Sequence, residues 1–220
     1  LETSRELINQ LLRRFGVVFK ELLANELPRL QWAKVFRTLR LMELSGEVLA
    51  GRFFQGIPGI QFASPEAARR LQAWSFDEEG WESAVWWLNA MDPASLCGLG
   101  LDFSPSASDV AEGRAELRPP ELELPRRVPG NWLVYAGTRL VMVVRRNGRD
   151  VDLCLVPGDS LIGRVLAFFP ILLSRTLDSG PSIMIETING QAAASSPCLP
   201  DFRRAGFQAD HHGLSLWKRY

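Results

Sequence analysis

The chain has 220 residues, of which 46% are hydrophobic, and its formal net charge at pH 7 is zero. This length allows one or two domains with a buried core, and the neutral charge excludes a uniformly basic, histone-like binder of nucleic acid. The three cysteines are far apart and include no Cys-x-x-Cys pair. This cysteine pattern argues against a disulfide framework or a structural zinc site, and it favours a cytoplasmic location.

Three helices and a hairpin are predicted within the first 63 residues. Thr3 and Glu6 form a capping-box pattern at the start of the first helix. A second short helix is predicted over residues 17–24 and a third over residues 31–45. The hairpin that follows has Pro58-Gly59 at its turn, in the positions that a type II turn prefers. This order of elements predicts a winged helix.

The third helix has one apolar and one polar face. Its predicted buried stripe is Trp32, Val35, Phe36, Leu39 and Met42. The predicted opposite face carries Lys34, Arg37, Thr38 and Leu41. A solvated charged face is one interpretation of this pattern, and contact with nucleic acid is the other. The hairpin directly after the helix favours nucleic acid, and we expect phosphate contacts from Lys34, Arg37, Thr38, Arg40 and Arg52.

A fourth helix is predicted over residues 64–74, and the pattern changes to short strands from about residue 81. The predicted strands cover residues 84–90, 132–136, 138–144, 151–156, 183–188 and 213–218. Helices are predicted over residues 161–173, with an interruption at Pro170, and over residues 200–205. Residues 104–129 are rich in Pro, Ser, Glu and Arg and are predicted to form a long mobile loop.

These patterns predict an α+β fold with two domains. A winged-helix DNA-binding domain is expected over residues 1–80, and a β-barrel-like antiparallel domain with packed helices over residues 81–220. The longest apolar run, residues 165–173, is too short to cross a bilayer, so no membrane partner is expected. Because the chain begins with Leu1 at a helix start, we expect it to be a piece of a longer protein.

Several short sequence motifs, which occur in the same order along nearly the whole chain, resemble the C-terminal region of the bacterial Lhr (large helicase-related) proteins. They are residues 46–63 with Gly-Ile-Pro-Gly-Ile-Gln-Phe-Ala, residues 89–93, residues 186–190, Ala205-Gly206-Phe207 and Gly213-Leu214. The resemblance implies an accessory region downstream of a superfamily 2 helicase motor in the same polypeptide. It also implies winged helices followed by a β-barrel, an architecture similar to that of the AlkZ-type DNA glycosylases.

The predicted partners are DNA and the helicase motor, with a homo-oligomer as a further expectation. The chain has no Gly-x4-Gly-Lys-Ser/Thr phosphate loop and no acidic metal-binding box. No cofactor is therefore expected here, and ATP and Mg²⁺ would belong to the motor. Two alternatives remain within the family: a uracil-DNA glycosylase, and a non-catalytic module for DNA capture and oligomerisation. An independent winged-helix regulator is the alternative outside it.

The glycosylase alternative needs a carboxylate that activates water or stabilises a positively charged sugar. Asp210, beside the only histidines, His211 and His212, is the first candidate, and a polar loop before the last strand is its ordinary interpretation. Asp201, at the start of a short helix, is the second candidate, with helix capping as the alternative. Gln61 follows the hairpin turn, but the chain has no Gln-x-Gln pair of the AlkZ type.

Three tryptophans lie in or near the apolar strand at residues 84–90. Trp81, Trp86 and Trp87 could stack on bases, but their setting favours positions in the core.

Overall fold

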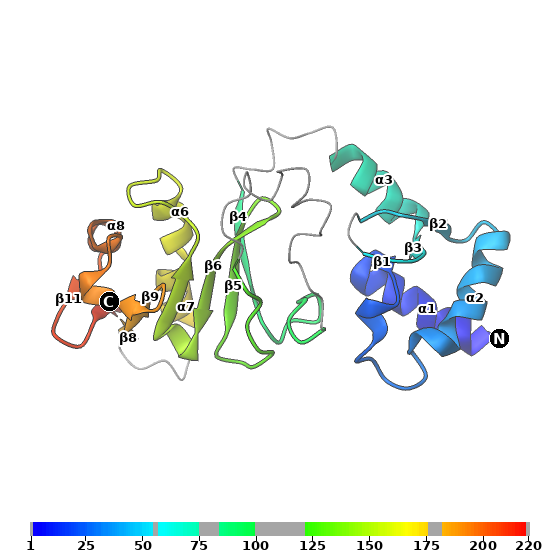
Figure 1. Cartoon of the computed structure of the whole chain (residues 1–220), viewed down its shortest axis with the longest axis horizontal. Helices are drawn as coiled ribbons and strands as arrows, with labels where there is room; N and C mark the ends of the chain where they lie inside the picture. Colours follow the sequence, from blue (N-terminus) through cyan, green and yellow to red (C-terminus); the bar gives the residue numbers. More distant parts are fainter. Residues whose placement is uncertain (1, 55–56, 75–83, 100–121, 176–181, 219–220) are drawn as a thin grey trace. The chain divides into compact units, whose positions relative to one another are not determined.

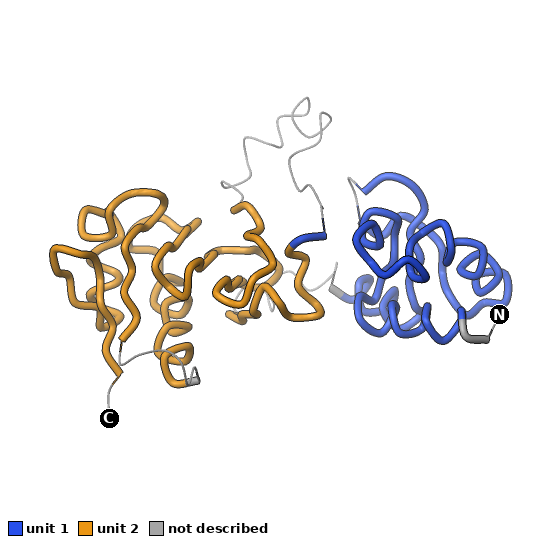
Figure 2. Tube along the Cα trace, turned by 90° about the horizontal axis from the view of Figure 1, so that it is seen from below, with its two compact units in different colours: residues 1–78, 98–113 blue, residues 79–97, 114–220 orange. Residues whose placement is uncertain are grey.

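The computed structural model describes residues 2–54, 57–74, 84–99, 122–175 and 182–218. The chain folds into two units, which Figure 2 draws in different colours. Unit 1 comprises Leu1–Glu78 with Gly98–Gly113, and unit 2 comprises Glu79–Cys97 with Arg114–Tyr220. None of the helices in the described ranges combines the length and the apolar character that crossing a membrane requires.

Unit 1 consists of helices and a small antiparallel sheet (Figure 1). Its elements are α1 (Glu2–Phe15), β1 (Val17–Val18), a 3₁₀ turn (Glu21–Leu23), α2 (Trp32–Leu44), β2 (Leu49–Gly51), β3 (Gln61–Ala63) and α3 (Pro65–Trp74). The strand order is β1-β3-β2. Helices α1 and α2 contact each other, and the core around them contains Ile8, Leu11, Leu23, Leu39, Met42 and Phe62. This is the order of helices, strands and wing hairpin expected of a winged helix.

The segment after α1 differs from the prediction of a second helix over residues 17–24. Gly16 takes a positive φ of 74° and ends α1, with its N–H donating to the carbonyl of Leu12. Val17 and Val18 then pair with Ala63 and Phe62 of β3. Two β-branched residues next to a strand with open hydrogen-bonding groups form a ladder more readily than a short helix. Only the 3₁₀ turn remains of the predicted helix.

Two helix N-termini can be compared with the capping residues predicted for them, Thr3 for α1 and Ser64 for α3. Helix α1 already begins at Glu2, so Thr3 lies inside its first turn rather than at the cap position that the capping-box prediction gave it. At α3, the Ser64 hydroxyl accepts the N–H of Ala67 at 3.1 Å, and Pro65 is the first helical residue, as predicted.

Unit 2 contains two sheets, with helices packed against them (Figure 1). Its strands are β4 (Val85–Asn89), β5 (Trp132–Ala136), β6 (Arg139–Arg145), β7 (Asp150–Leu153), β8 (Ser182–Ile185), β9 (Thr187–Ile188), β10 (Gln191–Ala192), β11 (Gln208–Ala209) and β12 (Leu214–Trp217). Its helices are α6 (Ile162–Leu166), α7 (Phe168–Arg175) and α8 (Leu199–Arg204), with 3₁₀ turns at Arg146–Gly148 and Ala193–Ser195.

The described strands of unit 2 do not close into a barrel. The larger sheet has the order β10-β9-β7-β6-β5-β4, and the smaller one has the order β11-β12-β8. The strand predicted over residues 183–188 is divided at Glu186, because β8 pairs with β12 whereas β9 pairs with β7. The N–H groups of Glu186 and Thr187 both donate to the carbonyl of Arg149 at this point. The chain thus passes from one sheet to the other, and the sheets stay open.

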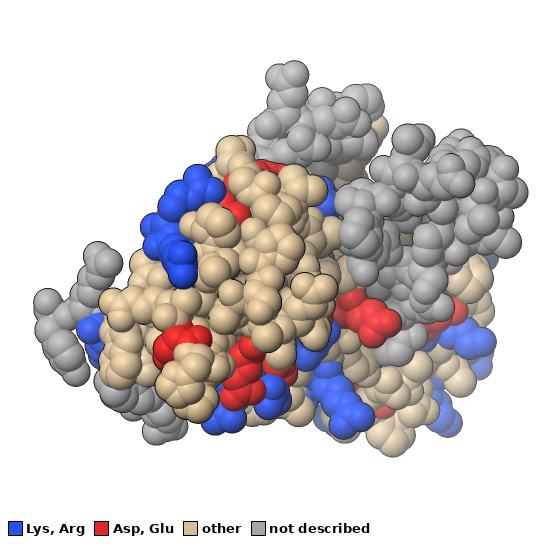
Figure 3. Space-filling view, turned by 60° about the vertical axis from the view of Figure 1, so that its left-hand side comes forward, with Lys and Arg blue, Asp and Glu red and all other residues tan. Residues whose placement is uncertain are grey.

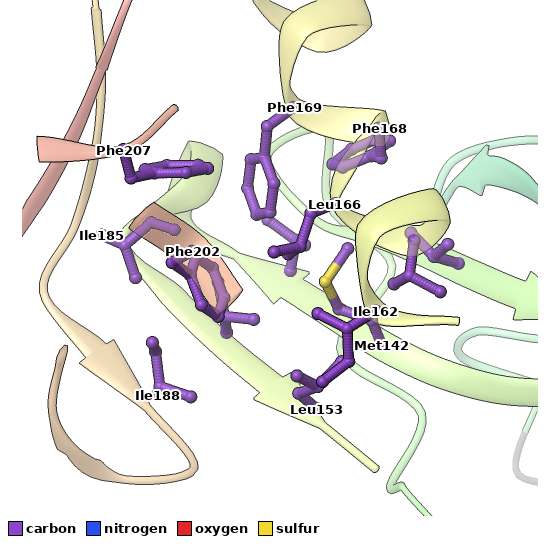
Figure 4. Packing of buried hydrophobic residues seen from close by; sticks show 14 of the residues in the cluster. Met142, Leu153, Ile162, Leu166, Phe168, Phe169, Ile185, Ile188, Phe202 and Phe207 are labelled. Carbon is purple, nitrogen blue, oxygen red and sulfur yellow. The ribbon is translucent and has the colours of Figure 1, made fainter. Parts of the chain in front are cut away.

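One hydrophobic core joins both sheets of unit 2 to their helices. Figure 4 shows Phe169 of α7 on the side of Phe202 of α8 and of Phe207. The neighbouring ring of Phe168 packs against Trp87 and Trp132 of the larger sheet. The rings of Phe169, Phe202 and Phe207 form a mutual cluster, with centroid separations of 5.3–6.5 Å. Buried aromatic rings of this size contribute strongly to the stability of a core.

Two further predictions in unit 2 need correction. The helix over residues 161–173 is interrupted at Ala167, not at Pro170, because α7 starts at Phe168 and Pro170 lies in its first turn, where proline is tolerated. The predicted loop over residues 104–129 lies outside the described residues up to residue 121. Its last part is packed rather than free, since Leu122 and Leu124 contact the cluster around Leu133 and Val143.

Candidate nucleic-acid interface

Helix α2 presents one face to the core of unit 1 and the opposite face to solvent. Val35, Leu39 and Met42 are buried, with exposed fractions of 3% or less. Lys34 and Arg37 are exposed on the other side of the helix, as predicted from their spacing. The wing hairpin of β2 and β3 follows immediately, so helix and wing are adjacent elements of one small domain.

The predicted orientation of α2 about its axis was wrong in one respect. Thr38, expected among the exposed polar residues, is only 7% exposed, whereas Phe36, expected in the core, is 37% exposed. The Phe36 ring instead lies at the rim of the core, 5.3 Å from Trp32 and 6.1 Å from Phe62 between ring centroids. A small Thr fits where the helix lies close to its neighbours, and a large ring does not. Thr38 is therefore poorly placed to contact a ligand.

Three of the predicted basic contacts are free to bind an anion. Within the described residues, no carboxylate lies at ion-pair distance from Lys34, Arg37 or Arg52, and all three side chains are exposed. Arg40 is also exposed, but it pairs with Glu43 one turn along α2. An anion that binds Arg40 must therefore compete with this carboxylate.

The exposed side of α2 and the wing also carry apolar side chains, of which the sequence interpretation named Leu41 but missed Leu44 and Leu49. Leu44 is 79% exposed, and Leu41 and Leu49 are 41% and 45% exposed. The signal was present in the sequence, because Arg37, Leu41 and Leu44 share one helical stripe. This surface therefore combines cations with apolar contact area.

Gln61 holds the wing loop in place. Its side chain is fully buried, and its Oε1 accepts the N–H groups of Phe53 and Phe54 at 2.9 and 2.8 Å. Its Nε2 donates to the carbonyls of Phe54 and Ile57 at 2.9 and 3.3 Å. These bonds occupy two acceptor and two donor positions, the whole ordinary capacity of a carboxamide. Gln61 positions the loop that carries Arg52, and it has no group left for chemistry on a substrate.

Asp210 is exposed in the turn between β11 and β12. Its Oδ1 accepts the N–H groups of His212 and Gly213 at 2.7 and 3.0 Å, and the Ser215 hydroxyl lies 3.4 Å from Oδ2. The hydrogen bond from the His212 backbone is the main cause that lowers the pKa of Asp210 below its usual value. The carboxylate is therefore ionised at neutral pH, which suits stabilisation of a cation better than acceptance of a proton.

Asp201 is 5% exposed, and its carboxylate makes structural contacts within unit 2. Its Oδ2 accepts the N–H of Gly158 at 3.1 Å, and its other oxygen pairs with Arg204 one turn along α8. These contacts join the turn after β7 to α8. Within the described residues, no group of three His, Cys, Asp or Glu side chains is placed to bind a metal ion.

The face drawn in Figure 3 shows no large basic patch that would be a second candidate for binding nucleic acid. Basic and acidic side chains stand there in small interspersed groups, and most of the described surface is uncharged. A nearly balanced surface of this kind produces only a weak long-range field. On this face, therefore, no charged patch competes with the unpaired cations of α2 and the wing as a candidate for contact with an anionic polymer.

The fold and this surface define unit 1 as a winged-helix domain, and comparison with known proteins agrees. Residues 2–83 match a family model described as the winged-helix domain of the large helicase-related protein. The Lhr helicase/uracil glycosylase of Escherichia coli K12 is 23% identical over 221 residues, which cover 97% of this chain and 13% of that protein. The Lhr helicase/probable uracil glycosylase of Mycolicibacterium smegmatis is 27% identical over 184 residues, which cover 83% of this chain and 11% of that protein.

The part of the chain that holds the winged helix thus matches the Lhr family, and the chain as a whole is similar to part of two Lhr proteins, in agreement with the resemblance that the sequence motifs indicated. The chain spans only about an eighth of the length of either relative. The likeness to AlkZ-type glycosylases stays a prediction.

Proposed function

We propose that this chain is a DNA-binding portion of an Lhr-type DNA-repair helicase. The observation that carries the proposal is the set of exposed, unpaired cations Lys34 and Arg37 on α2, with Arg52 on the wing directly after it. An α-helix fits the major groove of DNA, and a neighbouring wing can reach the phosphates beside it. The helicase motor, with its ATP and Mg²⁺, would lie elsewhere in the same polypeptide and receive the DNA that this portion holds.

The contacts proposed here are mainly to phosphates. Lys and Arg without carboxylate partners gain the most from a phosphate, because no internal ion pair has to be broken. The exposed leucines beside them add apolar contact with sugars. We expect little dependence on DNA sequence from this surface.

The double variant Lys34→Ala/Arg37→Ala tests the proposal. Fluorescence anisotropy with labelled duplexes of two unrelated sequences should show weaker binding, to the same degree for both. The slope of log K against log salt concentration should become shallower by roughly 1.8, or about 0.9 for each phosphate that the variant no longer neutralises.

The matched control is Arg69→Ala/Arg70→Ala on α3, which removes the same charge from another exposed helix of unit 1. Its salt slope should stay within about 0.5 of the wild-type value. An unchanged slope in the α2 variant, or an equal change in the α3 variant, would refute the proposed interface.

A uracil-DNA glycosylase activity is the second candidate, favoured by the names of the two relatives. Excision passes through a positively charged sugar, which an ionised carboxylate stabilises. Asp210 is the better candidate because it is exposed and ionised, whereas Asp201 is buried and paired with Arg204. A base flipped out of the duplex would have to reach the turn between β11 and β12.

Asp210→Asn tests this activity while keeping the turn. An asparagine oxygen can still accept the N–H groups of His212 and Gly213, but it carries no charge. Alkali-labile sites in uracil-containing DNA should disappear in this variant while DNA affinity stays the same. Unreduced excision by Asp210→Asn would remove Asp210 from the mechanism. No excision by the wild-type chain would favour the non-catalytic alternative, a module for DNA capture and oligomerisation.

A further inference from the structure

Trp86 and Tyr135 form an aromatic stack on unit 2, in which Trp86 is exposed and Tyr135 is partly buried against the cluster around Leu133 and Val143. They face each other in the register of β4 and β5, with ring centroids 4.3 Å apart and planes only 6° from parallel. Trp86 is 42% exposed, contrary to the core position that its apolar strand predicted. Trp87 points to the other side of the sheet, as the alternation of a strand requires, and packs against Phe168 at 5.9 Å between centroids. Trp81 lies outside the described residues.

The orientation of the Trp86 ring is fixed by its one polar group. The indole N–H donates to the carbonyl of Gly137 at 2.7 Å, on the turn that follows β5. Burial raises the pKa of Tyr135 to about 12, so its phenol stays neutral at physiological pH. The stack is thus uncharged, and the indole has no further donor or acceptor to offer a ligand. What remains available for recognition is a flat π surface.

We propose that the Trp86–Tyr135 stack is a platform for an unpaired base of single-stranded nucleic acid. Such a base offers a free π face, whereas a base inside a duplex is already stacked on both sides. Because the indole N–H is already used, the platform would accept any base without reading its edges. This inference rests on the proposed function, and it adds a single-strand contact on unit 2 to the duplex contacts of α2 and the wing.

The test measures stacking directly, with an oligothymidylate of about 12 nucleotides that carries one 2-aminopurine. Stacking of 2-aminopurine on an aromatic side chain quenches its fluorescence. The intact chain should quench the probe on binding. Trp86→Ala should abolish the quenching and weaken single-strand binding by roughly 5- to 150-fold, the range for loss of one stacked base. Binding of duplex DNA should stay unchanged.

Two variants separate stacking from general damage to unit 2. Trp86→Phe keeps an aromatic face over Tyr135 and should retain quenching, with less than about a tenfold loss of affinity. Trp217→Ala removes another exposed tryptophan, on β12, and should bind both DNA forms as the wild type does.

Several outcomes overturn the platform. Undiminished quenching by Trp86→Ala would do so, and so would the absence of single-strand binding by the wild-type chain. A Trp86→Ala variant that binds DNA normally but changes its oligomeric state in sedimentation would assign the stack to a protein contact. Normal duplex binding by Lys34→Ala/Arg37→Ala would instead refute the proposed interface on unit 1, so the two failures are distinguishable.

Discussion

Three polar side chains were candidates for catalysis from the sequence. In the structure they form much of their hydrogen bonding with backbone groups of the chain itself. Gln61 forms all of its hydrogen bonds with the wing loop, and Asp201 bonds the N–H of Gly158. Asp210 also accepts two backbone N–H groups, although it remains exposed to solvent. A buried backbone group without a partner is costly, so a polar side chain near a turn is readily recruited to satisfy it.

Replacement of Gln61 should destabilise unit 1 more than its small size suggests. Gln61→Ala leaves two N–H groups and two carbonyls of the wing loop without their partner. We expect a loss of about 2–4 kcal/mol in the free energy of unfolding, measured with urea.

Gln31→Ala is the control for this experiment. Gln31 is an exposed glutamine of the same unit, at the start of α2, and its side chain makes no capping hydrogen bond. Its replacement should change the unfolding free energy by less than about 0.5 kcal/mol. Equal effects of the two replacements would show that the Gln61 hydrogen bonds contribute little.

At the scale of elements, the rotation of α2 about its own axis decides which side chains can meet DNA. The buried set is Val35, Thr38, Leu39 and Met42, so the exposed centre of the helix lies near Arg37 and Leu44 rather than near Lys34 and Thr38. The sequence pattern misled here because Trp32 and Phe36 are large and apolar. At the rim of a small core, such rings are half covered by other rings instead of buried.

The orientation of α2 can be tested by comparing how much stability is lost when Leu39 and Phe36, on neighbouring sides of the helix, are each replaced by alanine. Leu39→Ala should cost about 2–5 kcal/mol, because Leu39 is fully buried. Phe36→Ala should cost less than about 3 kcal/mol, the lower limit for a fully buried phenylalanine, since its ring is 37% exposed. Denaturant unfolding of both variants measures the difference. A larger loss for Phe36→Ala would mean that α2 is turned toward the predicted orientation.

At the scale of the whole molecule, the largest network of ion pairs among the described residues lies where β6, β7 and β9 of unit 2 meet. Arg146 pairs with both Asp150 and Glu186, and Thr187 donates to Asp150 at 2.8 Å. Arg149 also pairs with Glu186 at 3.3 Å. This network joins the β6–β7 turn to the segment where the chain changes sheets. It therefore supports the connection between the two sheets of unit 2.

The network predicts how stability depends on pH. The hydrogen bond from Arg146 is the main cause that lowers the pKa of Asp150 below its ordinary value of 3.8. A carboxyl whose pKa is depressed by folding stabilises the folded state above its unfolded pKa and loses that contribution as pH falls through its folded pKa. The urea midpoint of unit 2 should therefore fall as the pH drops below about 4.

Asp150→Asn should reduce this fall of the urea midpoint at acid pH (the acid limb of the stability curve), because the amide does not titrate. The same variant should have a lower stability at neutral pH. Glu123→Gln, at an exposed carboxylate without an ion pair among the described residues, should leave the limb unchanged. An acid limb of the same steepness in Asp150→Asn would assign the pH dependence to other groups.

The local patterns of the sequence were sufficient for the mixed α+β class, for α2 with its basic residues, for the wing and for most strands of unit 2. Each depends on neighbours within a few residues: apolar periodicity, a glycine with positive φ, or a turn that sets the register of two adjacent strands. The family motifs were likewise readable from the chain alone, because their order and spacing are properties of sequence.

Contacts between distant residues decided the rest. Val17 and Val18 form a strand because β3, more than forty residues later, offers them a partner. The chain changes sheets at Glu186 because β12 and β7 compete for neighbouring residues, and Trp86 is exposed because one face of its strand packs on Phe168. Such choices depend on the free energy of pairing and burial across the whole unit, which no local window of the sequence contains.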